Sequence, residues 1–329
     1  MSNPATPSPM SRPLLGVLLA LAGFVIFSSH DALIKSLGGD YGVFQIVFFS
    51  VLFSFVPMTL IMATDRTEAS FVPHKPLFLL LRTTTVIIGM ICGFYAFTVL
   101  SLAEAYSLLF ASPLLITALS VPFLGEKVGA RRWAAVMLGL VGVMVVLRPG
   151  LQPLSLGHMA GLTAAVANSI GAIVVRKVGR EERSQTLILF PMVAVLLIMA
   201  VVMPSSYKPL PIFDLGTLAL MGLLLIAGQI FVLSAYRSAP AALIAPMQYS
   251  QIIWAALFGF FFFQEVPDLW VAVGSVLIVS SGVFVVWRES SGPNSNRTPV
   301  TRTRSFRIGV PWLSAKPADK PASAARAKN

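Results

Sequence analysis

The chain has 329 residues, of which 56% are hydrophobic and 11% are charged, and its mean hydropathy is +0.83. Soluble domains contain about 45–50% apolar and about 25% charged residues, so this chain carries too little charge to cover a water-exposed surface. Lipid is the solvent that suits the surplus apolar surface. The net charge of +11 does not indicate nucleic-acid binding. Nine of the 24 basic residues lie from Arg288 onward, and the others lie between apolar runs.

The composition gives little support for a metal site or a bound cofactor. The single cysteine, Cys92, cannot form an internal disulfide, and the three histidines, His30, His74 and His158, lack metal-ligand spacing. The sequence contains no Walker loop, nucleotide-binding glycine pattern or Ser-His-Asp arrangement. We therefore expect no metal, no cofactor and no ATP-driven transport by this chain alone.

Ten apolar runs follow one another along the chain, each near the roughly 20 residues that cross a bilayer as a helix. Turn and charge signals separate them, for example at residues 38–40 and 148–150. The first run ends without a small-residue cleavage pattern, so we interpret it as a retained helix rather than a signal peptide. The expected spans are 14–36, 42–63, 77–98, 102–124, 132–148, 157–176, 187–204, 215–236, 241–263 and 268–287.

The basic residues predict the orientation, because cytoplasmic loops carry an excess of Lys and Arg. With a cytoplasmic N-terminus and ten spans, 21 of the 24 basic residues fall on the inner side. The outer side receives only Lys35, Arg148 and Lys208. A missed or invented span would invert every later loop and remove this asymmetry. We therefore expect both termini in the cytoplasm and a bacterial inner membrane as the location.

The two halves of the chain share landmarks about 140 residues apart. Five spans separate the copies, and because five is odd, the second copy enters the membrane upside down. This inverted repeat is the plan of secondary transporters, whose halves rock about a central site. The matched landmarks are Glu126 and Glu265, Trp133 and Trp270, Gly142 and Gly282, and Arg148 and Arg288.

Short motifs recur in order across both halves and carry a family resemblance. In the first half they are residues 95–97 (Tyr-Ala-Phe), 102–105 (Leu-Ala-Glu-Ala), 112–115 (Ser-Pro-Leu-Leu), 124–126 (Leu-Gly-Glu), Trp133, 138–139 (Leu-Gly) and Gly142. In the second half they are residues 235–237 (Ala-Tyr-Arg), 239–241 (Ala-Pro-Ala), 245–246 (Ala-Pro), Trp254 and Glu265. Over residues 14–288 the chain resembles the drug/metabolite transporter superfamily in its EamA-type branch.

The resemblance implies an all-α membrane protein of ten helices in two inverted five-helix repeats, with a central cavity open to one side at a time. The expected segments are 1–13, a cytoplasmic N-terminal segment, 14–148 and 149–288, the two repeats, and 289–329, a disordered basic cytoplasmic tail. Many relatives carry arginine where Ser50 stands and glycine where Thr83 stands. Relatives transport amino acids, vitamins, S-adenosylmethionine, sugars, amines and drugs, so the resemblance names no substrate.

Four charged residues are candidates for gating or coupling, because a charge within the membrane is costly unless it is satisfied. Asp31 and Lys35 are four residues apart and can pair on one helix face, as a gate, a proton site or a snorkelling ion pair. Glu104 lies in the first turn of the fourth helix. Its carboxylate either interacts favourably with the helix dipole or takes part in proton coupling. Arg82 either anchors the inner boundary of the third helix or meets an anionic group of the solute.

Amides and aromatic residues are candidates for the solute path. Gln248 and Gln251 are three residues apart on one helix face, with Tyr249 and Trp254 beside them. Such groups suit a planar or aromatic solute, although amides also hydrogen-bond between membrane helices. The other candidates are Gln229, Tyr236, Asn168, Tyr95 and Tyr106.

The sequence therefore predicts a secondary transporter whose partners are a small organic solute and membrane lipid. Gly89 and Gly93 form a GxxxG motif that serves either a homodimer face or close packing inside the bundle. A lipid-modifying membrane enzyme is the alternative from another class, and a channel is the third. Scattered histidines disfavour the enzyme, and the absence of a repeated filter-like motif disfavours the channel.

Overall fold

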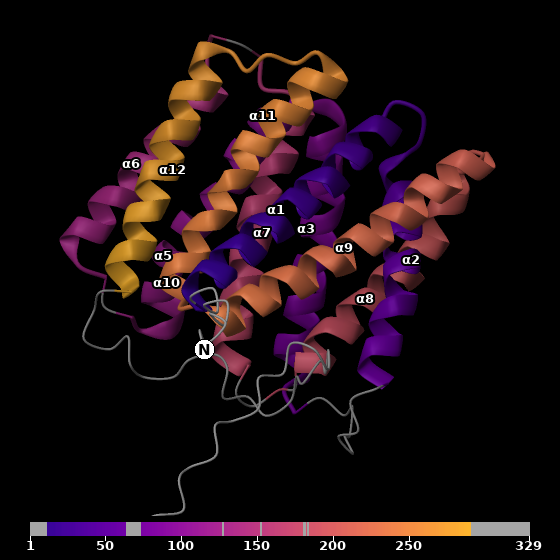
Figure 1. The fold of residues 1–329 in the computed structure, drawn as a ribbon, viewed down its shortest axis with the longest axis horizontal. Helices are drawn as coiled ribbons and strands as arrows, with labels where there is room; N and C mark the ends of the chain where they lie inside the picture. Colours follow the sequence, from indigo (N-terminus) through magenta and orange to yellow (C-terminus); the bar gives the residue numbers. More distant parts are fainter. Residues whose placement is uncertain are drawn as a thin grey trace, which may run out of the picture.

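The computed structural model describes residues 12–63, 74–126, 128–151, 153–179, 182 and 184–290. This part of the chain is helical and contains no strand (Figure 1). The terminal segments 1–11 and 291–329, including nearly all of the expected basic tail, lie outside the described residues.

The helices follow the expected spans closely. They are α1 (Arg12–Leu37), α2 (Val43–Ala63), α3 (Pro76–Val99), α4 (Leu102–Leu109), α5 (Ala111–Leu124), α6 (Ala130–Leu147), α7 (Leu156–Val178), α8 (Ser184–Val202), η1 (Met203–Ser206), α9 (Ile212–Ser238), α10 (Ala241–Ile244), η2 (Ala245–Tyr249), α11 (Ser250–Phe263) and α12 (Leu269–Ser290). Within the described part, nine helical segments of 18 to 27 residues are long and apolar enough to cross a membrane, with α4 and α5 forming one of them.

The expected span 241–263 is not one continuous helix. It consists of α10, the 3₁₀ turn η2 and α11, and so it is not among the nine long segments. Pro246 lies inside η2 and has no N–H to donate to the preceding turn, which favours a break in the α-helix at this point. The expected ninth span is therefore present as a broken helix, and Pro246 is the physical reason for the break.

The span from 102 to 124 is broken at the corresponding place. It divides at Phe110 into α4 and α5, just before Pro113. Pro113 cannot donate to the carbonyl of Leu109, and the hydroxyl of Ser112 donates to that carbonyl instead, at 2.7 Å. Phe110 and Tyr249, the residues at the two breaks, are 139 positions apart (249 − 110).

Other features repeat with the same spacing and confirm the inverted repeat. The helices α5 and α11 both end at a residue in the left-handed conformation, Gly125 with φ 68° and Gln264 with φ 56°, again 139 positions apart (264 − 125). The helix pairing is symmetric as well, because α1 packs on α9 as α7 packs on α3, and α6 packs on α12.

Close packing at glycines holds these helix pairs together. A Cβ on Gly142 of α6 would lie 2.9 Å from the carbonyl oxygen of Gly274 on α12, so only glycine fits at this crossing. Gly89 and Gly93 are buried, and a Cβ on Gly89 would lie 2.8 Å from Oδ1 of Asn168 on α7. The GxxxG motif thus packs α3 against α7 inside the bundle.

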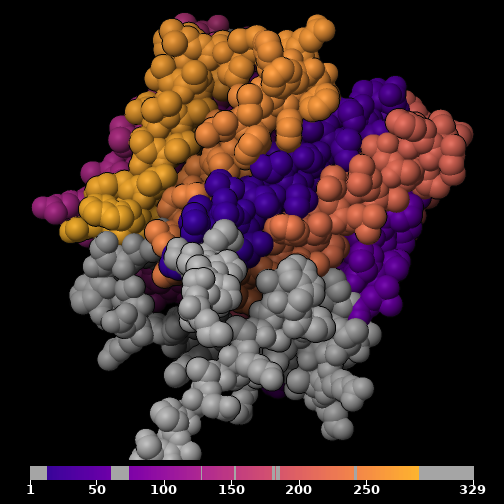
Figure 2. Space-filling view, in the orientation of Figure 1, coloured from indigo at the N-terminus to yellow at the C-terminus, as the bar shows by residue number. Residues whose placement is uncertain are grey.

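The outer surface of the bundle is apolar. Figure 2 shows α12, α11, α1 and α9 as adjacent diagonal bands on one face. Large hydrophobic side chains are exposed on α9, α11 and α12, as at Phe213, Leu223, Phe260, Val276 and Trp287. A continuous apolar surface of this kind requires lipid around it.

Candidate functional site

A cavity of about 390 Å³ lies between the two halves of the chain. We call it the central cavity. Both repeats line it, through helices α1, α3, α4 and α5 of the first and through α7, η2 and α11 of the second. The lining residues are Asp31, Phe97, Tyr106, Leu109, Phe110, Ser112, Pro113, Ile116, Asn168, Gln248 and Gln251. Five of them, Asp31, Tyr106, Asn168, Gln248 and Gln251, were candidates from the sequence.

The two broken spans meet at the central cavity. The rings of Phe110 and Tyr249, one at each break, contact each other with centroids 5.1 Å apart. Gln248 lies in η2, and Gln251 lies in the first turn of α11. A 3₁₀ helix has three residues per turn, so residues three positions apart, such as these two glutamines, lie on the same side of the helix. The breaks therefore place the amides of the second repeat opposite the aromatic rings of the first.

Asp31 is the centre of a hydrogen-bond network on the cavity wall. Its Oδ2 accepts a hydrogen bond from the hydroxyl of Tyr106 at 2.5 Å, and its Oδ1 lies 2.8 Å from Nδ1 of His30. The Tyr106 oxygen in turn lies 3.3 Å from the hydroxyl of Ser28 and accepts a bond from Nε2 of Gln251 at 3.3 Å. The network thus connects α1, α4 and α11 across the two repeats.

His30 extends the network to α2. The side chain is buried, and its Nε2 lies 3.4 Å from the hydroxyl of Ser50, which is fully buried. A ring proton on Nδ1 allows His30 to donate to Asp31, and Nε2 then lies within hydrogen-bond distance of the Ser50 hydroxyl. The departure from the family pattern at Ser50 therefore lies next to the cavity network.

The predicted pairing of Asp31 with Lys35 was wrong. Lys35 points toward the end of the bundle, where its Nζ lies 2.7 Å from Oε1 of Glu265 and donates to the carbonyl of Leu100 at 2.5 Å. The other oxygen of Glu265 accepts a hydrogen bond from the N–H of Leu102 at 3.1 Å. A tertiary contact between α1, the α3–α4 turn and the end of α11 thus outcompetes the local pair.

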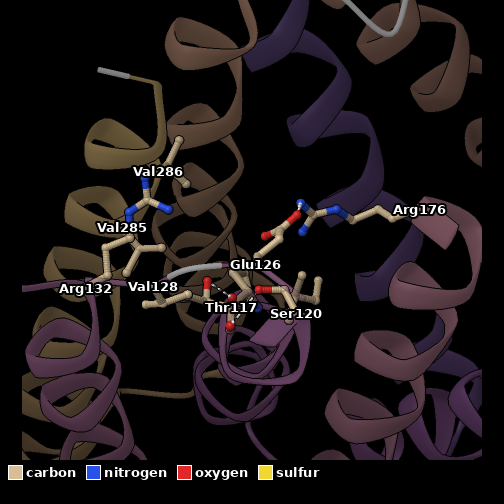
Figure 3. Close-up of a pocket in the computed structure, with 10 residues that line it drawn as sticks. Thr117, Ser120, Glu126, Val128, Arg132, Arg176, Val285 and Val286 are labelled. Carbon is tan, nitrogen blue, oxygen red and sulfur yellow. Dashed lines mark hydrogen bonds and ion pairs between the residues drawn. The ribbon is translucent and has the colours of Figure 1, made fainter. Parts of the chain in front are cut away.

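Glu126 lies at the opposite end of the bundle from Glu265. Glu265 contacts the start of the 23-residue segment Leu102–Leu124, and Glu126 follows its end, so that roughly 34 Å of helix separates them. We call these two ends the Glu265 end and the Glu126 end. Glu126 forms its own ion pair, with the guanidinium of Arg176 at 2.5 Å (Figure 3).

A second, smaller cavity of about 120 Å³ lies at the Glu126 end. It shares Pro113 and Ile116 with the central cavity, and it continues along α5 past Thr117 and Ser120 to Glu126. The residues of α5 in this path are three or four positions apart and therefore share one helix face. Figure 3 shows Thr117, Ser120, Glu126 and Arg176 around this cavity.

The two ion pairs differ in exposure. The side chains of Lys35 and Glu265 are 11% and 24% exposed, whereas those of Arg176 and Glu126 are 38% and 37% exposed. The Lys35–Glu265 pair is therefore the more enclosed of the two, and the cavities lead toward the Glu126 end.

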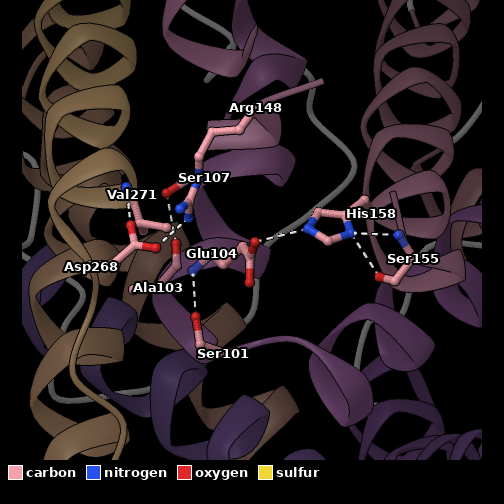
Figure 4. Close-up of polar contacts among 9 residues, drawn as sticks. All are labelled: Ser101, Ala103, Glu104, Ser107, Arg148, Ser155, His158, Asp268 and Val271. Atoms are coloured by element: carbon pink, nitrogen blue, oxygen red, sulfur yellow. Dashed lines mark hydrogen bonds and ion pairs between the residues drawn. The ribbon is translucent and has the colours of Figure 1, made fainter. Parts of the chain in front are cut away.

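Glu104 and Arg148 form further contacts at the Glu265 end (Figure 4). Oε1 of Glu104 lies 2.9 Å from Nε2 of His158, and Nδ1 of His158 accepts from the N–H of Ser155 at 3.0 Å. The hydroxyl of Ser101 caps α4 by accepting from the N–H of Glu104. Glu104 thus joins α4 to α7, a contact that the helix-capping interpretation did not include.

Arg148 and Asp268 connect α6 to α12 at the same end. The carboxylate of Asp268 also accepts a hydrogen bond from the N–H of Val271 at 2.8 Å, which caps α12. Desolvation alone would raise the pKa of Asp268, but the bond from Val271 and the charge and hydrogen bond of Arg148 outweigh it and lower this pKa.

The remaining path candidates do not line either cavity. Gln229 and Tyr236 are exposed on α9. Tyr249 is buried against Phe110 and Gly282, and the indole of Trp254 packs toward Phe258.

Tyr95 and Arg82 on α3 are partly buried, and the Arg82 guanidinium lies against the α7 backbone where Gly171 leaves room for it. Helical rotation decides these placements, and the apolar pattern alone did not define it.

Several residues of the cavity wall and of the hydrogen-bond network behind it could not be assigned to the site from the sequence. His30, Ser28 and Ser50 are polar residues inside apolar runs, which was a usable signal because such residues need partners in a membrane. Phe97, Leu109 and Ile116 look like any other apolar residue of a membrane helix, so their position at the cavity could not be recognised.

Comparison with known proteins connects this architecture to a family. The sequence pattern of the EamA-like transporter family matches the chain twice, over residues 14–148 and 155–287. A solved crystal structure aligns with a TM-score of 0.59 at 18% identity, covering 84% of this chain and 98% of the other, and therefore shares the fold.

Similar proteins include transporters from bacteria and mammals. The chain is 27% identical over 266 residues to the pseudopaline exporter CntI of Pseudomonas aeruginosa, covering 80% of this chain and 93% of that protein. It is 26% identical over 280 residues to the S-adenosylmethionine uptake transporter of Rickettsia felis, covering 84% and 94%. It is 26% identical over 299 residues to human solute carrier family 35 member G1, covering 85% and 81%.

The family pattern covers both halves of the chain, and the apolar helices and the relatives agree with it. The protein therefore belongs to the EamA-like transporter family and is a multi-pass membrane transporter of small solutes, not an enzyme.

Proposed function

We propose that this protein is a secondary transporter that moves a small organic metabolite across a bacterial inner membrane by alternating access. The observation that carries the proposal is the central cavity, which residues of both repeats line at the breaks of their related spans. Broken helices at a repeat interface are where secondary transporters bind their substrates. A volume of about 390 Å³ is typical of a pocket for a small molecule.

The exposure of the two ends supports an alternating mechanism. In this conformation the cavities lead toward the Glu126 end, while the partly buried Lys35–Glu265 pair joins the helices at the other end. We propose that the conformation is the inward-open one, with the Glu126 end in the cytoplasm. Rocking of the repeats would break one pair as it buries the other.

Gln248, Gln251, Asn168 and Tyr106 are the proposed solute contacts in the central cavity. The two relatives with named bacterial solutes are an exporter and an uptake transporter. They therefore leave the direction of transport open, and the same cavity serves either direction.

The test is solute flux in sealed proteoliposomes that contain the purified protein. Candidate metabolites are first selected by their ability to raise the unfolding temperature of the protein. Uptake of the selected solute should be saturable and should accelerate when the same unlabelled solute is preloaded inside, as exchange through one site requires. Flux that rises linearly with concentration and does not respond to preloading would indicate a channel and would contradict the proposal.

A further inference from the structure

The central cavity has a single charged side chain in its wall. Among the described residues that line it, Asp31 is the only one with a carboxylate or a basic group, and the others are aromatic, aliphatic, hydroxyl or amide side chains. A charge inside a membrane protein is costly unless a partner of opposite charge or several hydrogen bonds compensate it. The partners of Asp31 therefore decide what the cavity attracts.

The hydrogen bonds of Asp31 fit an ionised carboxylate. The Tyr106 hydroxyl donates to Oδ2, and Nδ1 of His30 lies 2.8 Å from Oδ1, so that a ring proton on this nitrogen also donates to the carboxylate. A carboxylate can accept about four hydrogen bonds, so these two donors do not exhaust it. With a neutral His30, the form that leaves the site open to a cation, the network carries the single negative charge of Asp31.

No lysine or arginine in the described part of the chain forms an ion pair with Asp31. Lys35, one helical turn away, is held by Glu265 and by the carbonyl of Leu100. Arg82 lies against Gly171 on α7, outside the cavity lining. The Asp31 carboxylate on the cavity wall is thus paired with neither of these basic side chains.

The rest of the wall suits a positive charge as well. The rings of Phe97, Tyr106 and Phe110 form a continuous series, with centroids 5.2 Å apart for the first pair and 5.7 Å for the second. All three line the cavity. Aromatic faces attract organic cations, and the attraction is stronger where water is excluded.

We propose that the central cavity binds an organic cation, with an ammonium or sulfonium centre of the solute against the carboxylate of Asp31 and its apolar part against the three rings. The amides of Gln248, Gln251 and Asn168 bind the polar groups of the same solute. This assignment rests on the proposed function of the cavity as the transport site. The assignment specifies the charge of the solute, which the fold by itself does not determine.

Matched probe pairs test the charge class directly. The pairs are S-adenosylmethionine with S-adenosylhomocysteine, choline with 3,3-dimethylbutanol, and arginine with citrulline, each a cation with a close neutral or net-uncharged counterpart. Binding to the purified full chain is measured by calorimetry and by the shift in unfolding temperature. At least one cation should bind, and its counterpart should bind at least about tenfold more weakly, which corresponds to about 1.4 kcal/mol.

Two variants test whether Asp31 causes the preference for the cationic probes. Asp31→Asn keeps the size of the side chain and removes its charge, so the preference for the cation should fall to about twofold or less. Asp214→Asn removes a carboxylate from α9, outside the cavity lining, and should bind both members of the pair as the unchanged protein does. The unfolding temperature without ligand shows whether each variant is folded.

Each other outcome overturns the inference. It is wrong if uncharged or anionic probes bind as well as the cations, if no cation binds, or if Asp31→Asn retains the preference. Should Asp31→Asn abolish only a pH dependence of transport and leave cation affinity unchanged, Asp31 is a proton site rather than the cation site. Saturable flux of a neutral solute would leave the proposed function intact while removing this inference.

Discussion

The ammonium nitrogen of Lys35 lies 2.7 Å from a carboxylate oxygen of Glu265, and this contact ties the end of α1 to the end of α11. The inverted repeat supplies its counterpart at the other end of the bundle, where Arg176 on α7 pairs with Glu126 after α5. Two ion pairs in related positions at opposite ends are what an alternating mechanism needs, because each can stabilise closure of its own end.

We expect Glu265→Gln to increase opening at the Glu265 end, because the amide cannot form the ion pair with Lys35. Each kcal/mol lost from the closed state raises the open population about fivefold. The measurement is the labelling rate of Ile116→Cys, which lines both cavities, by a membrane-impermeant thiol reagent added from outside in a Cys92→Ala background.

The double variant Lys35→Glu/Glu265→Lys restores the pair with reversed charge and should return labelling to its original rate. Glu126→Gln changes the other end and should not increase labelling from outside. Unchanged labelling in Glu265→Gln would show that the Lys35 contact does not control access.

Glu126 and Glu265 should be accessible from opposite sides of the membrane, because the repeat is inverted and roughly 34 Å of helix separates them. With Cys92→Ala as background, Glu265→Cys should react with an impermeant reagent in intact cells, and Glu126→Cys only after lysis. Equal labelling of both positions in intact cells would contradict this arrangement.

Gln251→Ala and Gln248→Ala should raise the transport KM while the amount of folded protein stays unchanged. Both amides line the central cavity, and each 1.4 kcal/mol of lost binding is about tenfold in affinity. Gln229→Ala is the matched control, since Gln229 is exposed on α9 outside the cavity lining. If the cavity variants lose protein yield instead of affinity, the two glutamines serve helix packing.

Both termini should be cytoplasmic, as the 21-to-3 division of basic residues predicts. A reporter that is active only in the periplasm should be silent when fused after Arg288. The same reporter fused after Arg148, at the Glu265 end, should be active. The reverse pattern would invert the assignment of the two ends.

Asp268→Ala should lower stability by about 1 kcal/mol, because the carboxylate caps α12 through the N–H of Val271. The pKa of Asp268 is lowered in the folded protein, so the ionised form stabilises the fold above the ordinary pKa near 3.8 and the effect is lost as the pH falls. Unfolding temperatures should therefore differ between wild type and variant at pH 7 and converge toward pH 3. A constant difference would exclude ionisation as the cause.

The sequence by itself determined the membrane class, the order of the apolar helices and the likeness of the two halves. Apolar runs of about 20 residues have one stable solution in lipid, a helix that satisfies its own backbone. The landmarks Glu126 and Glu265 indicated the repeat, because their spacing along the sequence does not depend on how each helix is rotated about its axis. Gln248 and Gln251 were predicted to face the interior, since amides facing hydrocarbon would lack partners, and both line the central cavity.

Only the tertiary structure decided which polar groups meet. Lys35 is four residues from Asp31, but Glu265, 230 positions later in the sequence (265 − 35), is its partner. Gln229 and Gln251 carry the same side chain, yet one is exposed and the other lines the cavity. In lipid-embedded helices the apolar pattern covers every face, so the rotation of each helix follows from its packing against its neighbours, at contacts such as Gly142 with Gly274.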